Sequence, residues 1–310
     1  MTTEISPLGT ASAVPTRERH LSGTALRREG RLLLFDCGEG TQFQLLRAGL
    51  KRSHLDAIFI THLHGDHYFG LMGLLSTLAL LNRIEPLTLV GPAGIAEIVQ
   101  AMPGVRQDDL PFRVAYVELW DDLRYEVVFE TKAFTVEARP LDHRVFTVGY
   151  RFQGKTQPGN LDVEQAQALG VTDYRHYRAL KAGEDVTLDD GRRVPPEAVV
   201  GPPRPGGSFA YVTDTRPCEA AVTLARDADL LYHEATFGED LPERAAETGH
   251  STAHQAAEIA RRAGAKKLIL GHFSARYKDV SGLVEQARDV FQNTEAAEEL
   301  KRYKIFPAGP

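Results

Sequence analysis

The chain contains only two cysteines in 310 residues, Cys37 and Cys218, which is too few for a disulfide framework. The N-terminus has no basic region followed by an apolar segment, so we expect no secretory signal. The uncharged stretch from Tyr68 to Leu81 is shorter than the roughly 20 residues that a membrane helix needs. These absences favour a cytoplasmic protein that does not cross a membrane.

A surplus of basic residues is also missing. Lys and Arg number 36 against 42 Asp and Glu, which gives a net charge of −6. This balance argues against a protein coated in basic surface for nucleic acid, although a local basic or metal-lined cleft stays possible. With 43% apolar and 25% charged residues, the chain has the composition of an ordinary globular protein with a sizeable core.

Strand-like runs dominate the chain, with helices between the later ones. Residues 111–153 read as antiparallel sheet, and strands resume after residue 207, separated by helix patterns such as 251–264, which Gly264 closes. Residues 154–207 hold two helix-compatible pieces between glycine and proline clusters, and we expect them to project as an insertion without a core of its own. We therefore predict an α/β protein whose two comparable halves pack sheet on sheet.

One predicted strand after another ends in a histidine or an aspartate. The ends of neighbouring strands lie at one edge of a sheet, so these side chains can converge. The first strand runs into "THLHGDH", residues 61–67, and the whole set is His62, His64, Asp66, His67, His143, Asp214 and His272. Isolated histidines such as His20, His54, His176 and His254 are better explained as surface or hydrogen-bonded core residues.

Metal ions would explain why so many imidazoles and carboxylates gather in one place. Crowded together without a cation, these groups would be costly to desolvate. Imidazole and carboxylate ligands suit Zn²⁺, Mn²⁺ or Fe, with zinc as the first expectation. Seven ligands are too many for one tetrahedral ion, whereas a pair sharing one carboxylate uses them all. Because a metal pair generates hydroxide near neutral pH, the pattern predicts a hydrolase.

The motif "HLHGDH" resembles the signature of the metallo-β-lactamase superfamily. The resemblance implies a four-layer αβ/βα sandwich with a binuclear site at one edge of two sheets. It also implies two Zn²⁺ per subunit, with Mn²⁺ or another divalent metal as an alternative. It assigns His62, His64 and His143 to the first metal, Asp66, His67 and His272 to the second, and Asp214 to the bridge.

Within the superfamily the chain is most similar to the bacterial tRNase Z family, through the segments "SPLGTASAVPTRER", "LLFDCGEGTQFQLLRAGL", "LYHEATF", "GHST" and "GHFSARY". The resemblance implies a cytoplasmic homodimer that cuts the 3′ trailer from precursor tRNA after the discriminator base, by attack of metal-bound hydroxide. It implies that His250, oriented by Glu234, protonates the leaving oxygen. Asp66 is expected to be a catalytic residue as well as a metal ligand. Arg276 and Arg17 are the expected RNA contacts.

The match departs from the family at two places. Residues 154–207 occupy the position of the family's tRNA-binding arm, inserted in a single domain of residues 1–310, but "TDYRHYRA" at 172–179 replaces a Gly-Pro-rich turn. The arm holds seven Lys or Arg and eight Asp or Glu, so it has no basic excess. In "PTRERH", Arg17 and His20 replace a lysine and an asparagine.

Two alternatives therefore stay open. The first is a binuclear phosphodiesterase acting on small or non-tRNA substrates, which would show no preference for folded tRNA. The second is a non-catalytic RNA-binding protein, whose binding would survive removal of metal.

Overall fold

Two seven-stranded sheets stack face to face in the computed structural model, which describes residues 3–306. The order of the first sheet is β16-β1-β2-β3-β4-β5-β6, and that of the second is β15-β14-β13-β12-β9-β8-β7. The strands are β1 (Thr3–Gly9), β2 (Gly23–Arg28), β3 (Arg31–Phe35), β4 (Leu55–Phe59), β5 (Leu87–Pro92), β6 (Val114–Leu119), β7 (Glu126–Glu130), β8 (Phe134–Leu141), β9 (Thr147–Gly154), β12 (Ser208–Val212), β13 (Leu230–Glu234), β14 (Leu268–Gly271), β15 (Thr294–Ala296) and β16 (Tyr303–Ile305).

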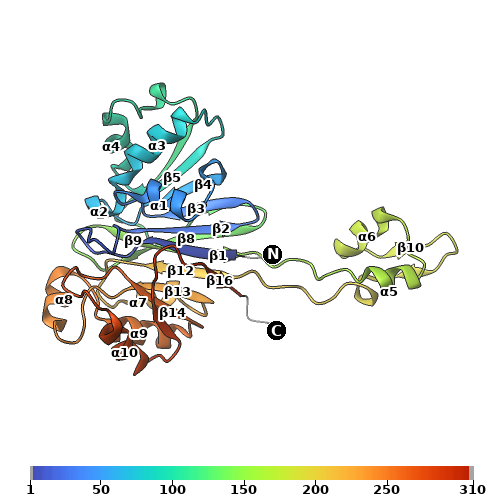
Figure 1. Cartoon of the computed structure of the whole chain (residues 1–310). Helices are drawn as coiled ribbons and strands as arrows, with labels where there is room; N and C mark the ends of the chain where they lie inside the picture. The colour runs from blue at the N-terminus through green and yellow to red at the C-terminus, as the bar shows by residue number, and fades with distance from the viewer. Residues whose placement is uncertain (1–2, 307–310) are drawn as a thin grey trace.

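Helices cover the outer face of each sheet, which gives four layers (Figure 1). The first sheet is covered by α1 (Thr41–Arg47), α3 (Gly70–Leu80) and α4 (Ile95–Ala101), and the second by α7 (Glu219–Leu224), α9 (Ala253–Ala263) and α10 (Ser281–Arg288). The short helices α2 (Gly65–Tyr68) and α8 (Pro242–Thr248) lie at one end of the sandwich. Among the described residues, no helix has the length and apolar character that crossing a membrane requires.

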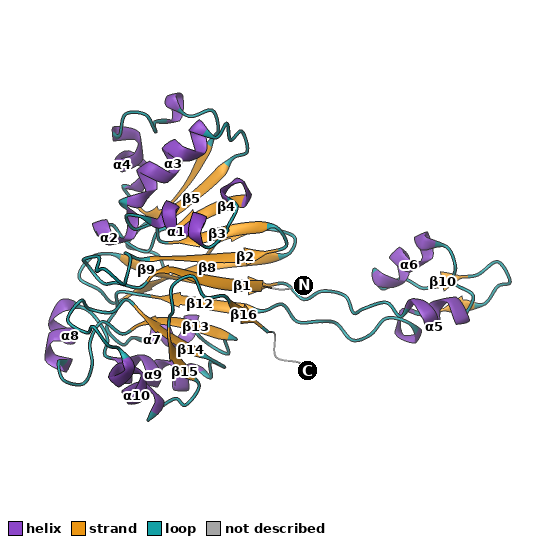
Figure 2. Ribbon diagram, in the orientation of Figure 1, coloured by secondary structure: helices purple, strands orange, loops and turns teal. Residues whose placement is uncertain are grey.

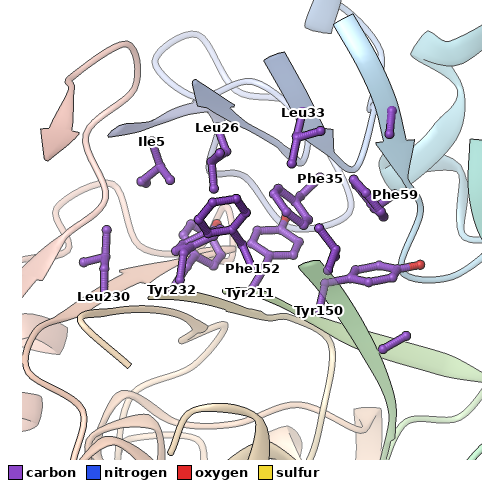
Figure 3. Close-up of a cluster of buried hydrophobic side chains, with 14 of the residues drawn as sticks. Ile5, Leu26, Leu33, Phe35, Phe59, Tyr150, Phe152, Tyr211, Leu230 and Tyr232 are labelled. Carbon is purple, nitrogen blue, oxygen red and sulfur yellow. The ribbon is translucent and has the colours of Figure 1, made fainter. Parts of the chain in front are cut away.

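Aromatic side chains from both sheets form the central core (Figure 3). The ring of Phe35 stacks on Phe59 at a centroid distance of 5.1 Å and meets Phe209 of the opposite sheet edge-on at 5.6 Å. The hydroxyl of the buried Tyr150 donates to the carbonyl of Ile60 over 2.7 Å. The sheets are thus locked together beside the loop that follows β4, where the histidine-rich motif begins.

The prediction of antiparallel sheet across residues 111–153 is wrong for its first strand. β7, β8 and β9 are antiparallel in the second sheet, but β6 pairs parallel with β5 in the first. The reason is α4, a helix between β5 and β6 that the sequence reading overlooked. A helical crossover returns the chain so that the two strands run parallel.

The insertion of residues 154–207 leaves the end of β9 and reaches well beyond the sandwich (Figure 2). It contains α5 (Val163–Ala168), α6 (Tyr174–Lys181) and a two-stranded hairpin of β10 (Val186–Thr187) and β11 (Arg193–Val194). The expectation that it lacks a core is wrong. Short apolar side chains from all four elements pack into a small buried cluster, namely Ala166, Val171, Leu180, Val186, Val194 and Val199.

Candidate metal centre

The histidine-rich loop begins where β4 ends, at the edge where the chain crosses from sheet to helix. Thr61 and His62 are fully buried there, and the short helix α2 starts at Gly65 and carries Asp66 and His67. His64 stands at the N-cap of α2 in an extended conformation. The switch from extended chain to helix within six residues points successive side chains into one space.

Three more predicted ligands enter that space from the second sheet. His143 follows β8, Asp214 follows β12 and His272 follows β14 directly. Asp214 and His272 have φ values of 48° and 56°, in the left-handed region that non-glycine residues seldom adopt. Such backbone conformations persist where surrounding contacts fix them, and they concentrate at functional sites.

The seven predicted ligands come together in two groups. Ligand atoms of His62, His64, His143 and Asp214 lie within 4.8 Å of one another, and so do those of Asp66, His67 and His272. Asp214 lies between the groups, because its Oδ1 is 3.7 Å from Nε2 of His62 and its Oδ2 is 3.2 Å from Nε2 of His67. This division matches the assignment that the family resemblance implies.

The free ring nitrogens fit a metal site. Nδ1 of His143 donates to the Gly249 carbonyl over 2.7 Å, and Nδ1 of His272 lies 3.0 Å from Thr236 Oγ1. Within residues 3–306, Nε2 of His143 and Nε2 of His272 are buried without a hydrogen-bond partner. In a metal-binding histidine, one ring nitrogen makes a hydrogen bond that fixes the ring, and the other nitrogen offers its lone pair to the metal. The donor set therefore fits divalent cations.

Electrostatics favour the ligand forms of Asp214 and His62. Burial alone would raise the pKa of Asp214, but the charges of His272, His67 and His62 hold that pKa well below its usual range. Burial and the neighbouring His67 lower the pKa of His62 well below its ordinary value. Ionised carboxylate beside neutral imidazole is the combination that binds Zn²⁺ or Mn²⁺.

Asp36 is a functional residue that the sequence reasoning missed. Its fully buried carboxylate accepts from Nδ1 of His67 over 2.8 Å, from Tyr211 over 3.1 Å and from the backbone N–H of Thr61 over 2.8 Å. It fixes His67 so that Nε2 faces Asp214 and Asp66. The signal was present in "FDCGEG", where a carboxylate follows a buried strand as it does at Asp214.

Two glycines, Gly38 and Gly70, allow the loop after Asp36 to pack closely against the helices that follow the histidine-rich motif. A Cβ at Gly38 would lie 2.4 Å from the Asp66 carbonyl oxygen, and one at Gly70 would lie 2.1 Å from the Gly38 carbonyl oxygen. Real Cβ atoms do not approach so closely, so only glycine lets the Asp36 loop press against α2.

A histidine and a glutamate stand beside the two groups of ligands. Nδ1 of His250 donates to Oε1 of Glu234 over 2.9 Å, and the carboxylate also accepts from Thr215 N over 2.8 Å and Thr236 Oγ1 over 2.6 Å. Burial alone would lower the pKa of His250, but the charge and hydrogen bond of Glu234 raise it to about 9. His250 is also close to Asp214, with Nδ1 3.9 Å from Oδ1.

The two predicted RNA contacts are not part of this cluster. Arg17 and Arg276 are both exposed. The loop that carries Arg17 does reach the site, because the backbone N–H of Ala13 donates to Oδ2 of Asp66 over 2.9 Å.

Comparison with known proteins identifies the family. The model of the metallo-beta-lactamase superfamily matches residues 22–156, and that of the beta-lactamase superfamily domain matches residues 171–273. Ribonuclease Z of Salinibacter ruber is 54% identical over 99% of this chain and 96% of its own, and that of Gloeothece citriformis is 45% identical over 97% and 96%. A structure of human tRNase Z, short form, has a TM-score of 0.73 at 29% identity and covers 98% of this chain and 100% of that chain. The predicted fold is confirmed.

We predict that Asp36→Asn weakens metal binding by roughly 10- to 100-fold, as loss of an outer hydrogen-bond partner does at other metal sites. Whichever way the amide turns, its N–H groups face a donor, either the backbone N–H of Thr61 or the pair His67 and Tyr211, so the support of the His67 ring is weakened. Competition with a chelator measures the change, and Asp56→Asn is the control because Asp56 pairs with Arg31 at the surface. Equal affinities for the two variants would contradict this role of Asp36.

Proposed function

Because the chain belongs to the metallo-beta-lactamase superfamily and, within it, to the ribonuclease Z family, we propose that it is a metal-dependent endoribonuclease that removes the 3′ trailer from precursor tRNA. The observation that carries this proposal is the 54% identity to a ribonuclease Z over 99% of the chain. The proposed cut follows the discriminator base and leaves a 3′-hydroxyl on the tRNA. The likeness to human tRNase Z supports the same substrate.

We further propose that the seven clustered residues hold two zinc ions, with Mn²⁺ or another divalent metal as the alternative. His62, His64 and His143 would bind one ion, Asp66, His67 and His272 the other, and Asp214 both. The support is the pair of ligand groups on either side of Asp214, together with the Nε2 atoms of His143 and His272, which are buried without a hydrogen bond among the described residues. Cations held there would supply hydroxide near neutral pH and neutralise charge on the phosphate.

His250 has the properties of the proton donor to the leaving oxygen. Glu234 holds one proton on Nδ1 of His250 over 2.9 Å, so the second ring nitrogen can carry the proton that is transferred. Because Glu234 raises the pKa of His250, the imidazole stays protonated at neutral pH. Asp66 receives its hydrogen bond from the N-terminal loop, which ties that loop to the reacting centre.

A homodimer is supported by an exposed apolar face on α1, α3 and the loops beside them. α1 and α3 are joined by the 2.7 Å hydrogen bond from Thr77 Oγ1 to Gln42 Oε1. The exposed apolar side chains of this face are Phe43, Leu46, Phe69, Leu80, Leu81 and Ile84. Exposed apolar side chains on neighbouring elements are typical of interaction sites. A second copy of the chain is the proposed partner, and the cytoplasm, where the unpaired Cys37 and Cys218 stay reduced, is the proposed compartment.

The arm of each subunit would then serve its partner. Figure 1 shows α2, which carries two of the metal-site residues, at one end of the sandwich and the arm projecting from the other. An arm that points away from its own metal site is suited to hold tRNA at the site of the second subunit.

The test of the proposed function is to incubate the metal-loaded protein with a 3′-extended precursor tRNA and to map the product ends. We expect one cut after the discriminator base, slowed roughly 10²- to 10⁴-fold in His250→Ala, because general acid catalysis contributes that much. His254→Ala, four residues further along, is the control for local folding. Hydrolysis of small phosphodiesters with no cut in precursor tRNA would favour the alternative substrate class instead.

The pH dependence of cleavage tests the pairing of His250 with Glu234. Glu234 raises the pKa of His250, so replacing it with the neutral amide in Glu234→Gln lowers that pKa. Because the protonated imidazole is the active form, the alkaline limb of the kcat/KM profile should move to lower pH. An unchanged alkaline limb in Glu234→Gln would assign that ionisation to another group.

Removal of the arm tests both the exosite and the dimer. Gly154 and Gly206 already touch, so joining them deletes residues 155–205 without stretching the chain. We expect kcat/KM for precursor tRNA to fall at least roughly tenfold, the worth of one lost stacking contact, while a small chromogenic phosphodiester is hydrolysed as before.

Mixing the arm-deleted protein with His250→Ala should restore cleavage. In the mixed dimer, the intact site of one subunit is served by the arm of the other. Equal losses on both substrates after deletion would count against an exosite, and failure of the mixture to regain activity would count against exchange of arms between subunits.

A further inference from the structure

A hollow of about 330 Å³ lies beside the metal centre, and neither the predicted metal ligands nor His250 line it. It is formed by loops at the same edge of the sheets, after β4, β5, β6 and β8. Its main lining residues are Leu63, Ala93, Trp120, Asp121, Val145 and Phe146. The volume is at the lower end of the range of about 300–1,000 Å³ that is typical of small-ligand sites.

The hollow and the metal centre are built from the same stretches of chain. Leu63 stands between His62 and His64 in the chain, and Val145 follows His143 by two residues. The ring of His64 lies 5.4 Å from that of His143, which in turn lies 5.1 Å from that of His250. His143 thus adjoins both other rings, and the hollow is lined by chain neighbours of His64 and His143 but by none of His250.

The lining chemistry selects an uncharged aromatic ligand. Trp120 is 62% exposed and Val145 is 40% exposed, so apolar surface stands open to solvent next to a site that otherwise consists of polar groups. The charged side chain among the lining residues is that of Asp121, which would repel a phosphate. Nucleobases stack on exposed aromatic rings whatever their sequence.

We propose that this hollow receives a base of the 3′ trailer, within the first two nucleotides after the cut, stacked on Trp120. The inference rests on the proposed function, since it needs an RNA chain across the metal centre. His250 delivers its proton to the 3′-oxygen that the tRNA keeps, so the tRNA end lies on the His250 side. The trailer leaves the phosphate in the other direction, toward His64 and the hollow.

The test is a thermodynamic cycle between Trp120 and the trailer base. Precursor tRNA is made with normal nucleotides or with an abasic site at the first or second trailer position. Trp120→Ala should lower kcat/KM on the normal substrate by roughly 5- to 100-fold, the usual worth of one stacked base, and should have little further effect on the abasic substrate that removes this base. Trp120→Phe keeps a stacking face and should restore most of the activity.

Two controls keep the outcomes separate. Phe306→Ala removes another exposed aromatic residue, next to Ile305 near the root of the arm, and hydrolysis of a small chromogenic phosphodiester by Trp120→Ala reports whether the metal centre is intact. Equal losses on normal and abasic trailers would overturn the proposal, and so would a cycle that couples Trp120 to an abasic discriminator position instead. If the wild-type protein leaves precursor tRNA uncut, the proposed function fails first.

Discussion

The structure depends on holding five imidazoles and two carboxylates, most of them buried, at one edge of two sheets. Removing charges from water is costly unless opposite charges or metal ions compensate for them. His67, with no exposed surface, faces Asp36, Asp66 and Asp214, and these carboxylates overcome the effect of burial and raise its pKa well above the usual value. Such crowding would destabilise an ordinary core. Here the same groups can form a metal site, in which cations replace the protons on the imidazoles.

The rest of the sandwich supports this edge. Tyr211 lies in the aromatic core between the sheets, and its hydroxyl donates to Asp36, which orients His67. Thr236 joins the carboxylate of Glu234 to Nδ1 of His272, so the proposed proton donor and a metal-site residue share one support. A change in the core beneath either hydrogen bond is therefore transmitted to the reacting groups. Four-layer packing is what lets residues from opposite sheets share these contacts.

Sequence reasoning grouped the seven predicted ligands because they lie just beyond the ends of strands, and strand ends meet at a common edge. It missed Asp36 because a single carboxylate before a glycine-rich segment looks like a turn until its partners are in place. It expected β6 to be antiparallel because the short helix α4 has a weak sequence pattern, and the direction of a strand relative to its neighbour depends on the segment that connects them. Sequence reasoning missed the core of the arm because the residues that form it are small and are distributed over four short elements. The hollow at Trp120 is lined by loops that are distant from one another in the chain, so no local sequence pattern could predict it.

Both segments that depart from the expected family pattern make specific contacts in the structure. His20 in the N-terminal loop is held by the carboxylate of Glu299. The carboxylate accepts a hydrogen bond from Nδ1 of His20 over 2.8 Å and another from the backbone N–H of His20 over 2.8 Å. In the arm, "TDYRHYRA" forms α6, which Asp173 caps, and Tyr177 turns inward to donate to the Val171 carbonyl over 2.9 Å.

Within α6 the aromatic and basic side chains therefore differ in what they offer to RNA. Tyr177 belongs to the packing of the arm, whereas Tyr174 is 72% exposed. Asp173 already accepts from Arg175 Nε over 2.9 Å, which offsets the charge of that arginine, and Arg178 is exposed. Where the family resemblance implies a Gly-Pro-rich turn, this chain has a helix that presents the exposed Tyr174 together with the basic side chains of Arg178 and Lys181. A surface of that kind favours stacking with local phosphate contact over broad electrostatic attraction, in keeping with an arm that has no basic excess.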